Sequence, residues 1–134
     1  MCFWVFKWVF CHFLIDSGAS ECFVGIAFAE KNRLEMVKTK GKLKIHFADG
    51  TVSVSNWMVK QGCVMIREHA EYLHFSIIDL LAYNAILGKT WLDRWNPAIN
   101  WKTNTMQWKV GTEQITVTRV QDPQNPTIVA SIFK

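Results

Sequence analysis

Apolar and polar residues alternate along residues 38–54, and an alternation of period two is typical of half-buried β-strands. We interpret the polar positions as the solvent-facing side of the first strand and the apolar positions as its buried side. The solvent-facing positions are Lys38, Lys40, Lys42 and Lys44, and the buried positions are Leu43, Ile45 and Phe47. Val52 and Val54 continue the alternation after Asp49-Gly50, a pair that predicts a tight hairpin because such a turn needs positive φ.

Other apolar stretches also predict strands. They are residues 1–15, which predict one or two buried strands, and residues 57–65, 72–81 and 85–88. The segment 67–71 is predicted to be a polar loop. A later hairpin is predicted to turn at Thr103-Asn104, and the segment from Gly111 predicts a strand followed by a linker or tail.

Two short segments show helical spacing instead. Apolar residues within 24–34 recur three and four positions apart, so we predict a helix there. Residues 90–95 predict a second helix, which Thr90 can cap at its N-terminus and which Pro97 follows. The predicted fold class is therefore all-β in the broad sense, mainly strands with two short helices.

The composition is that of a single domain: 134 residues, half of them hydrophobic, with a formal net charge of +4. So small a charge does not indicate nucleic-acid binding, and we expect no nucleic-acid partner. The apolar run at residues 1–15 is shorter than the roughly 20 residues that span a bilayer, so we expect no membrane partner. Anchoring through that run is the alternative.

Cysteine and histidine side chains show no metal-ligand spacing. The chain has four of each and no C-x-x-C pair, so we expect no metal and no cofactor. Free thiols are the default expectation for such a chain. They predict a reduced, intracellular protein in the cytoplasm.

The segment FLIDSGAS, residues 13–20, is the candidate for chemistry. Its apolar start predicts the end of a buried strand, so Asp16 stands at the rim of the core, before the small residues of a tight turn. The Asp-Ser-Gly alone is weak evidence, because an Asx-type turn explains it without any catalysis. Three features favour catalysis: the strand before Asp16, the Asp-Gly hairpin that follows, and the apolar strand that ends at Gly88.

Three stretches of the sequence resemble the protease of gypsy-type LTR retrotransposons, a family of retropepsin-like aspartic proteases. They are LIDSGASECFV, FADGTVSV and AILGKTWLDRWNPAINWKTNTMQW, and they follow the family's order over about residues 13–108. The family carries a D-[ST]-G-A-[ST] loop, a flap hairpin, and an I-L-G-x-x-W-L segment that runs into N-P-x-I-[DN]-W-K-T. The last of these motifs is long and highly specific.

The resemblance implies a retropepsin-like closed barrel, the acid protease fold with one lobe per chain, and a role for each matching residue. Asp16 takes the catalytic position, and the residues that support the catalytic loop are Ser17, Gly18 and Ala19. The flap residues are Ala48, Asp49, Gly50 and Thr51. The residues packed beneath the active site are Ile86, Leu87 and Gly88.

The chain holds only one Asp-Ser-Gly motif, so a complete site of this kind needs a second chain. Aspartic proteases use two adjacent carboxylates that share one proton, and a two-fold axis supplies the second. The resemblance thus implies a homodimeric endopeptidase that activates water to hydrolyse a retrotransposon polyprotein, in the cytoplasm or in a virus-like particle. The alternative is a catalytically inactive relic or interaction module from a fragmentary retroelement.

We assign residues 1–110 to the protease domain and residues 111–134 to a C-terminal strand and a linker or tail. Residues 1–12 are atypical, because relatives carry a polar turn before the strand that leads to the aspartate. A truncated or unrelated start would explain this departure. In retroviral relatives the termini build part of the dimer sheet, so competence to dimerise depends on this segment.

Several further residues have a structural rather than a catalytic interpretation. Asp79 is predicted to end a strand and face a loop, and Asn84 stands where relatives often carry Asp. Lys89 occupies the place of a bracing Arg and lacks its planar fork, so any brace is weaker. Ser20 and Glu21 are candidates for lining the substrate groove, or for ordinary surface positions. Four tryptophans are predicted to pack in the core: Trp91, Trp95, Trp101 and Trp108.

Overall fold

The computed structural model describes residues 8–46, 50–67, 69–80, 83–118 and 128–133, with the backbone alone at residues 8–10 and 128–133. The strands are β1 (Trp8–Ile15), β2 (Phe23–Gly25), β3 (Val37–His46), β4 (Val52–Ile66), β5 (His69–Ile78), β6 (Ala85–Leu87), β7 (Ala98–Asn100), β8 (Thr105–Val110), β9 (Glu113–Thr118) and β10 (Ile128–Phe133). The helices are α1 (Ile26–Lys31) and α2 (Lys89–Trp95). The prediction of a mainly β fold with two short helices is confirmed.

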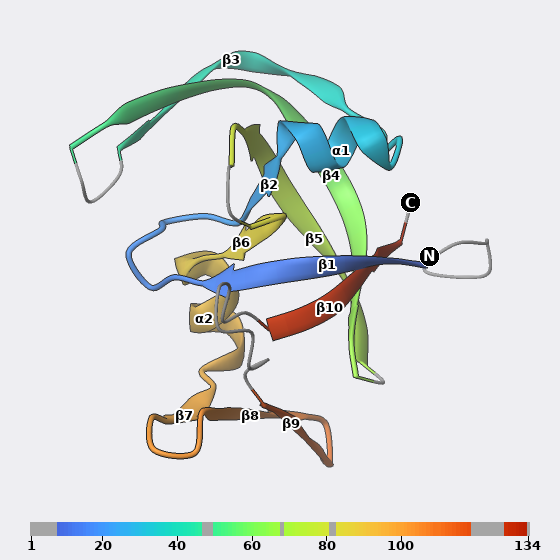
Figure 1. Cartoon of the computed structure of the whole chain (residues 1–134), viewed down its shortest axis with the longest axis vertical. Helices are drawn as coiled ribbons and strands as arrows, with labels where there is room; N and C mark the ends of the chain where they lie inside the picture. Colours follow the sequence, from blue (N-terminus) through green and yellow to red (C-terminus); the bar gives the residue numbers. More distant parts are fainter. Residues whose placement is uncertain (1–7, 47–49, 68, 81–82, 119–127, 134) are drawn as a thin grey trace.

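Seven strands form one curved sheet in the order β10-β1-β6-β2-β5-β4-β3 (Figure 1). β1 pairs in parallel with β6, and β2 pairs in parallel with β5. Strands β2 and β6 are buried along their whole length, which is why their sequences are continuous apolar runs. β10 pairs with β1 and also with β4, so it connects the two sides of the sheet, whereas β3 remains an edge strand.

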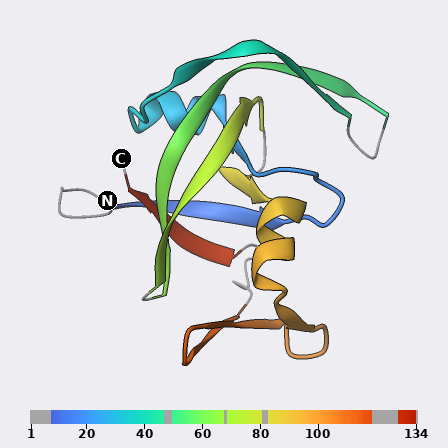
Figure 2. The same ribbon diagram turned by 180° about the vertical axis from the view of Figure 1, so that it is seen from behind.

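A separate antiparallel sheet of β7, β8 and β9 lies beyond the C-terminal end of α2 (Figure 2). Its inner face belongs to the main hydrophobic core through Met106, Trp108, Ile115 and Val117. The rings of Trp91 in α2 and Trp108 in β8 meet edge to face, with their centroids 5.1 Å apart. The predicted hairpin at Thr103-Asn104 is confirmed, and Asn104 has a φ of 56° there.

The hairpin predicted around Asp49-Gly50 is also confirmed, because β3 and β4 pair antiparallel up to His46 and Val52. Gly50 has a φ of 89°, a conformation that glycine adopts without strain. The turn residues 47–49 lie outside the described part of the chain. The lysines of β3 are exposed, as the alternation predicted, while Ile45 is buried.

Two local predictions were wrong. The segment 67–71 is mostly strand rather than loop, because β4 continues to Ile66 and β5 begins at His69, with Arg67 in a left-handed turn between them. Helix α2 is capped by the backbone of Gly88 rather than by Thr90. The Thr90 hydroxyl instead lies 3.6 Å from the Cys22 thiol.

The segment after Gly111 adds strands to both sheets. β9 pairs with β8 along its whole length, and β10 pairs with β1 and β4. Residues 119–127, which connect β9 to β10, lie outside the described residues, as do residues 1–7. The strand predicted within residues 1–15 corresponds to β1. In the described ranges, no helix combines the length and the apolar character that crossing a bilayer requires.

The expectation of free thiols holds for Cys11 and Cys22, which are buried, but not for Cys63, which is disulfide-bonded. Burial raises the pKa of the Cys11 and Cys22 thiols, so both stay protonated and unreactive near neutral pH. Neither is therefore a candidate nucleophile.

Candidate active site

Asp16 is the first residue after β1, a strand of the large sheet that pairs with β10 on one side and β6 on the other. β1 pairs in parallel with β6 up to Ile15 and Leu87, and the Asp16 amide then donates to the Leu87 carbonyl at 3.1 Å. The side chain is half-buried. A long-range backbone contact between residues 16 and 87 thus fixes the point at which the loop leaves the sheet.

The chain turns sharply after Asp16. The Gly18 amide donates to Asp16 Oδ1 at 2.8 Å, and the Ala19 amide donates to the Asp16 carbonyl at 3.2 Å. This is the Asx-type turn that the structural interpretation predicted. A Cβ on Gly18 would lie 3.1 Å from Asp16 Oδ1, so a larger residue would crowd the carboxylate. Ser17 and Gly18 are exposed, so this face of the loop is open to an approaching group.

The loop is held from beneath by the start of α2. The Lys89 amide donates to the Ala19 carbonyl at 2.7 Å. A Cβ on Gly88 would lie 2.0 Å from the Glu21 carbonyl oxygen and 2.7 Å from that of Ala19. Only glycine therefore lets the two backbones approach so closely. The structure thus places Gly88 directly against the loop, with Leu87 buried behind it.

Asn84 holds three strands together at the start of β6, the end of that strand opposite the Asp16 loop. Its amide donates to the His12 carbonyl at 3.0 Å, and its side-chain Oδ1 accepts from the His12 amide at 2.8 Å. Its own carbonyl accepts from the Gly25 amide at 2.8 Å. From the sequence, Asn84 is only a position at which relatives often carry Asp. In the structure its hydrogen bonds connect β1, β2 and the start of β6, and they need no charge.

Glu71 is the residue whose importance sequence reasoning missed. It is only 9% exposed, and its carboxylate faces His69, Trp91 and Trp95. The sequence does contain a pattern that could have identified Glu71, but the prediction of a loop at 67–71 concealed it. Glu71 stands two residues before Leu73 and four before Phe75. In a strand, those three side chains point to the same side.

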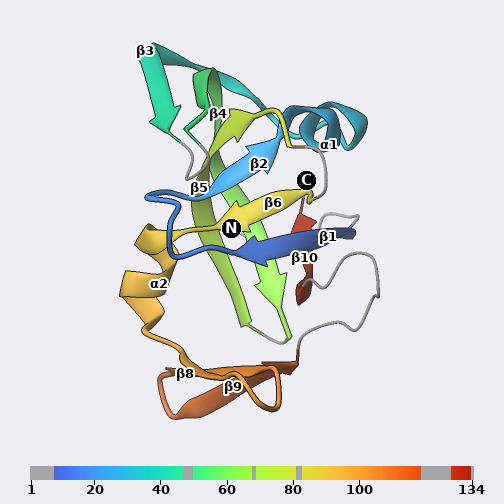
Figure 3. The same cartoon turned by 60° about the vertical axis from the view of Figure 1, so that its left-hand side comes forward.

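The hairpin of β3 and β4 arches over the Asp16 loop, on the same side of the molecule (Figures 1 and 3). Leu43 and Ile45 on its inner side belong to one apolar cluster with Ala19 and Ile86. Among the predicted flap residues, Gly50 and Thr51 are exposed. Ala48 and Asp49 lie outside the described residues.

The other residues singled out from the sequence differ in their burial and in the partners of their side chains. Asp79 is exposed just beyond β5, as predicted. The Lys89 ammonium pairs with Asp93 on its own helix, so its backbone rather than its side chain contacts the loop. Ser20 is exposed, and Glu21 is half-buried and accepts from the Ser76 hydroxyl at 3.4 Å. Within the described ranges, no three side chains are grouped as a metal site.

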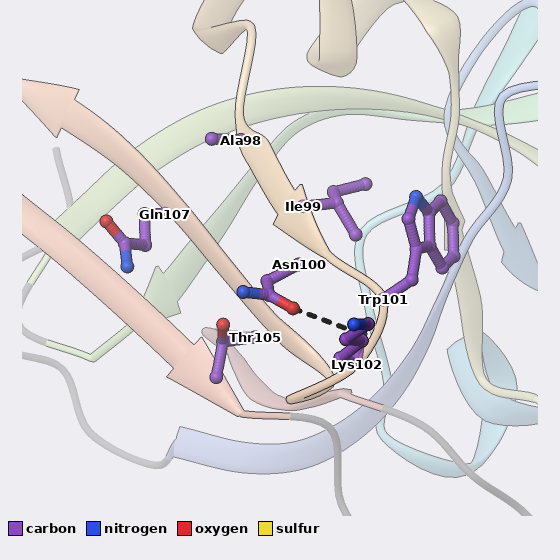
Figure 4. Close-up of a pocket in the computed structure, with 7 residues that line it drawn as sticks. All are labelled: Ala98, Ile99, Asn100, Trp101, Lys102, Thr105 and Gln107. Atoms are coloured by element: carbon purple, nitrogen blue, oxygen red, sulfur yellow. Dashed lines mark hydrogen bonds between the residues drawn. The ribbon is translucent and has the colours of Figure 1, made fainter.

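The prediction that all four tryptophans pack in the core was wrong for Trp101, which is 81% exposed. Trp101 lies in the turn after β7, beside an open hollow of about 600 Å³ (Figure 4). The hollow is lined by the apolar side chains of Ile99 and Trp101 and by polar ones, among them Asn100, Thr105 and Gln107. It lies on the small sheet, away from the Asp16 loop, and contains no carboxylate.

Comparison with known proteins gives two findings. A family model described as the PEG10/RTL1 protease domain matches residues 12–117, which include the Asp16 loop, the hairpin and α2. Among solved structures, the retroviral protease-like domain of Ddi1 from Leishmania major aligns with a TM-score of 0.55 at 19% identity. That alignment covers 89% of this chain and 96% of the other. The chain therefore has a retroviral protease-like fold, as its sequence predicted.

Proposed function

The chain belongs to the PEG10/RTL1 protease domain family, and from that premise we propose that it is an aspartic endopeptidase that works as a homodimer. The observation that carries the proposal is the placement of Asp16. Its carboxylate stands at the end of β1, which is paired on both sides, on a loop whose outer residues are exposed and whose underside is held by Gly88 and Lys89.

The chemistry requires two such carboxylates. Two acidic groups within a few ångströms cannot both ionise, so they share one proton, and aspartic proteases are the standard example of such a pair. The ionised member accepts a proton from a water molecule, and the neutral member donates to the carbonyl oxygen of the scissile peptide. The small residues Ser17, Gly18 and Ala19 allow a second copy of the loop to approach about a two-fold axis.

The substrate of this proposal is an extended polypeptide. It would lie between the Asp16 loop and the β3–β4 hairpin and would gain main-chain hydrogen bonds as an added strand. Descent from a gypsy-type retrotransposon, and a polyprotein substrate within the cytoplasm, belong to the same proposal. The sequence motifs shared with that group support the descent and the polyprotein substrate.

A peptidase assay with two matched variants tests the proposal. Wild-type protein is expected to cleave unstructured peptides at mildly acid pH, with sensitivity to pepstatin. Asp16→Asn should lower the rate by at least about a thousandfold, because it removes the proton-transfer group. Asp79→Asn makes the same chemical change at an exposed site beyond β5 and should leave the rate unchanged. If wild type is inert and monomeric, the alternative of a non-catalytic relic or interaction module replaces the enzyme.

A further inference from the structure

A buried carboxylate lies between β5 and α2. The side chain of Glu71 is only 7% exposed, and burying a charged group is costly unless hydrogen bonds compensate it. Exposed positions suited to a carboxylate are plentiful on this chain. The placement of Glu71 inside the domain therefore calls for a role that a carboxylate fills and an apolar side chain does not.

Three donors surround this carboxylate. Trp95 Nε1 donates to Glu71 Oε1 at 3.2 Å, and Trp91 Nε1 lies 3.4 Å from Oε2. His69 Nε2 lies 2.9 Å from the same Oε2. Indole N–H groups only donate, and Trp91 and Trp95 are four residues apart, on one face of α2. Both oxygens of Glu71 are thus used, and together they fix the position of α2 on β5.

The same helix begins where it holds the Asp16 loop. The Trp91 amide donates to the Gly88 carbonyl at 3.1 Å in the first turn of α2. The next residue after Gly88 is Lys89, whose amide donates to the Ala19 carbonyl at 2.7 Å. A Cβ at Gly88 would lie only 2.0 Å from the Glu21 carbonyl oxygen, so the start of the helix and the loop are in close backbone contact, and we expect a shift of the helix to move the loop.

We propose that Glu71 is a positioning residue for the catalytic aspartate, acting through α2. It touches no substrate. It fixes the helix against the sheet, and the start of the helix then holds the loop that carries Asp16. The inference rests on the proposed protease function, but its structural half, the coupling of Glu71 to the Ala19–Lys89 hydrogen bond, does not depend on activity.

Three variants separate positioning from simple packing. Glu71→Gln keeps the shape but turns one acceptor into an amide donor, so at least one indole loses its partner. Trp95→Phe removes one of the donors and keeps an aromatic ring. Trp108→Phe is the matched control, because Trp108 is buried against the same helix but its Nε1 has no hydrogen-bond partner within the described residues.

The first readout is hydrogen exchange at the Lys89 amide, compared in the same protein with the paired amides of the β3–β4 hairpin, which contains none of the substituted residues. We expect Glu71→Gln and Trp95→Phe to speed exchange at Lys89 about tenfold relative to that hairpin, as loss of one hydrogen bond to a charged group implies. Trp108→Phe should change the two regions equally. Equal changes in all three variants would overturn the inference and leave Glu71 a packing residue.

The second readout is peptide cleavage. Misplacement of the loop should lower kcat by at least about tenfold in Glu71→Gln and Trp95→Phe while KM changes little, because substrate contacts stay intact. Altered exchange with unaltered kcat would also overturn the positioning role. If the wild type itself does not cleave, the proposed function fails, and the exchange measurement alone then decides whether Glu71 holds the loop.

Discussion

Two turns of this molecule use the same local hydrogen bonds but stand in different surroundings. At the first, the Gly18 amide donates to the Asp16 side chain at 2.8 Å. At the second, the amides of Lys102 and Thr103 donate to Asn100 Oδ1 at 3.0 Å and 3.1 Å. Both are Asx-type turns, and their local geometry alone does not tell a catalytic loop from a simple connection.

The difference lies in what supports each turn. The Asp16 turn is tied to residues about 70 positions away in the sequence, because the Asp16 amide donates to the Leu87 carbonyl and the Lys89 amide donates to the Ala19 carbonyl. The turn is also packed against Gly88. The Asn100 turn is held by its own side chain and carries the highly exposed Trp101. We infer that long-range support beneath the loop, rather than the turn itself, distinguishes the site.

Removing that support should have the largest effect. Gly88→Ala places a Cβ 2.0 Å from the Glu21 carbonyl oxygen, where the obstacle is backbone that cannot move aside cheaply. We expect a loss of more than about 4 kcal/mol in the free energy of unfolding, measured by urea denaturation. Gly41→Ala is the control, because a Cβ there meets no atom within 4 Å. Similar stability of the two variants would show that the loop is not held from beneath.

The buried and the exposed tryptophan of the small-sheet region should differ next. Trp108 is 3% exposed and packs on Trp91, so Trp108→Ala should cost about 3 kcal/mol, the usual loss for a large buried aromatic. Trp101→Ala should cost less than about 0.5 kcal/mol, because most of that ring is already in solvent. Thermal unfolding of both variants checks this. A large loss for Trp101→Ala would mean that a contact absent from this structure covers the turn.

The smallest effect is expected at the Asn100 turn. Asn100→Ala removes one exposed acceptor and should lower the free energy of unfolding by about 1 kcal/mol. Asn100→Asp keeps the acceptor and should lose less. Neither change should affect cleavage. If Asn100→Ala abolished cleavage without unfolding the protein, the Asn100 turn would belong to the site, and the contrast between the two turns would fail.

Much of the fold could be predicted because short-range patterns decide it. The lysine alternation of β3, the glycine turn at Gly50 and the apolar run of β6 each follow from one local rule. The Asp16 loop could be predicted for the same reason, together with the resemblance of its flanking motifs. The position of Gly88 beneath the loop was expected only from that resemblance, because no local pattern reveals a contact with residues 19 and 21.

What could not be predicted depends on partners distant in sequence. Glu71 is a charged residue in a polar stretch, and the two indole donors of α2, together with His69, make its burial favourable. Trp101 and the buried Trp108 are the same residue type in similar surroundings along the sequence. Trp101 is nevertheless exposed, because β7 ends just before it and leaves it at the edge of the small sheet. The pairing of β10 with β1 and β4 joins the last described strand to the first, and no pattern in either strand specifies it.

The central claim is that two chains each contribute one Asp16 to a single site. The most direct measurement titrates the inactive Asp16→Asn chain into a fixed amount of wild type and follows peptide cleavage. We predict that cleavage falls as mixed dimers replace wild-type dimers, and that the activity per wild-type chain also falls on dilution without the variant. Cleavage that depends only on the amount of wild-type chain, whatever amount of Asp16→Asn is present, would contradict the claim.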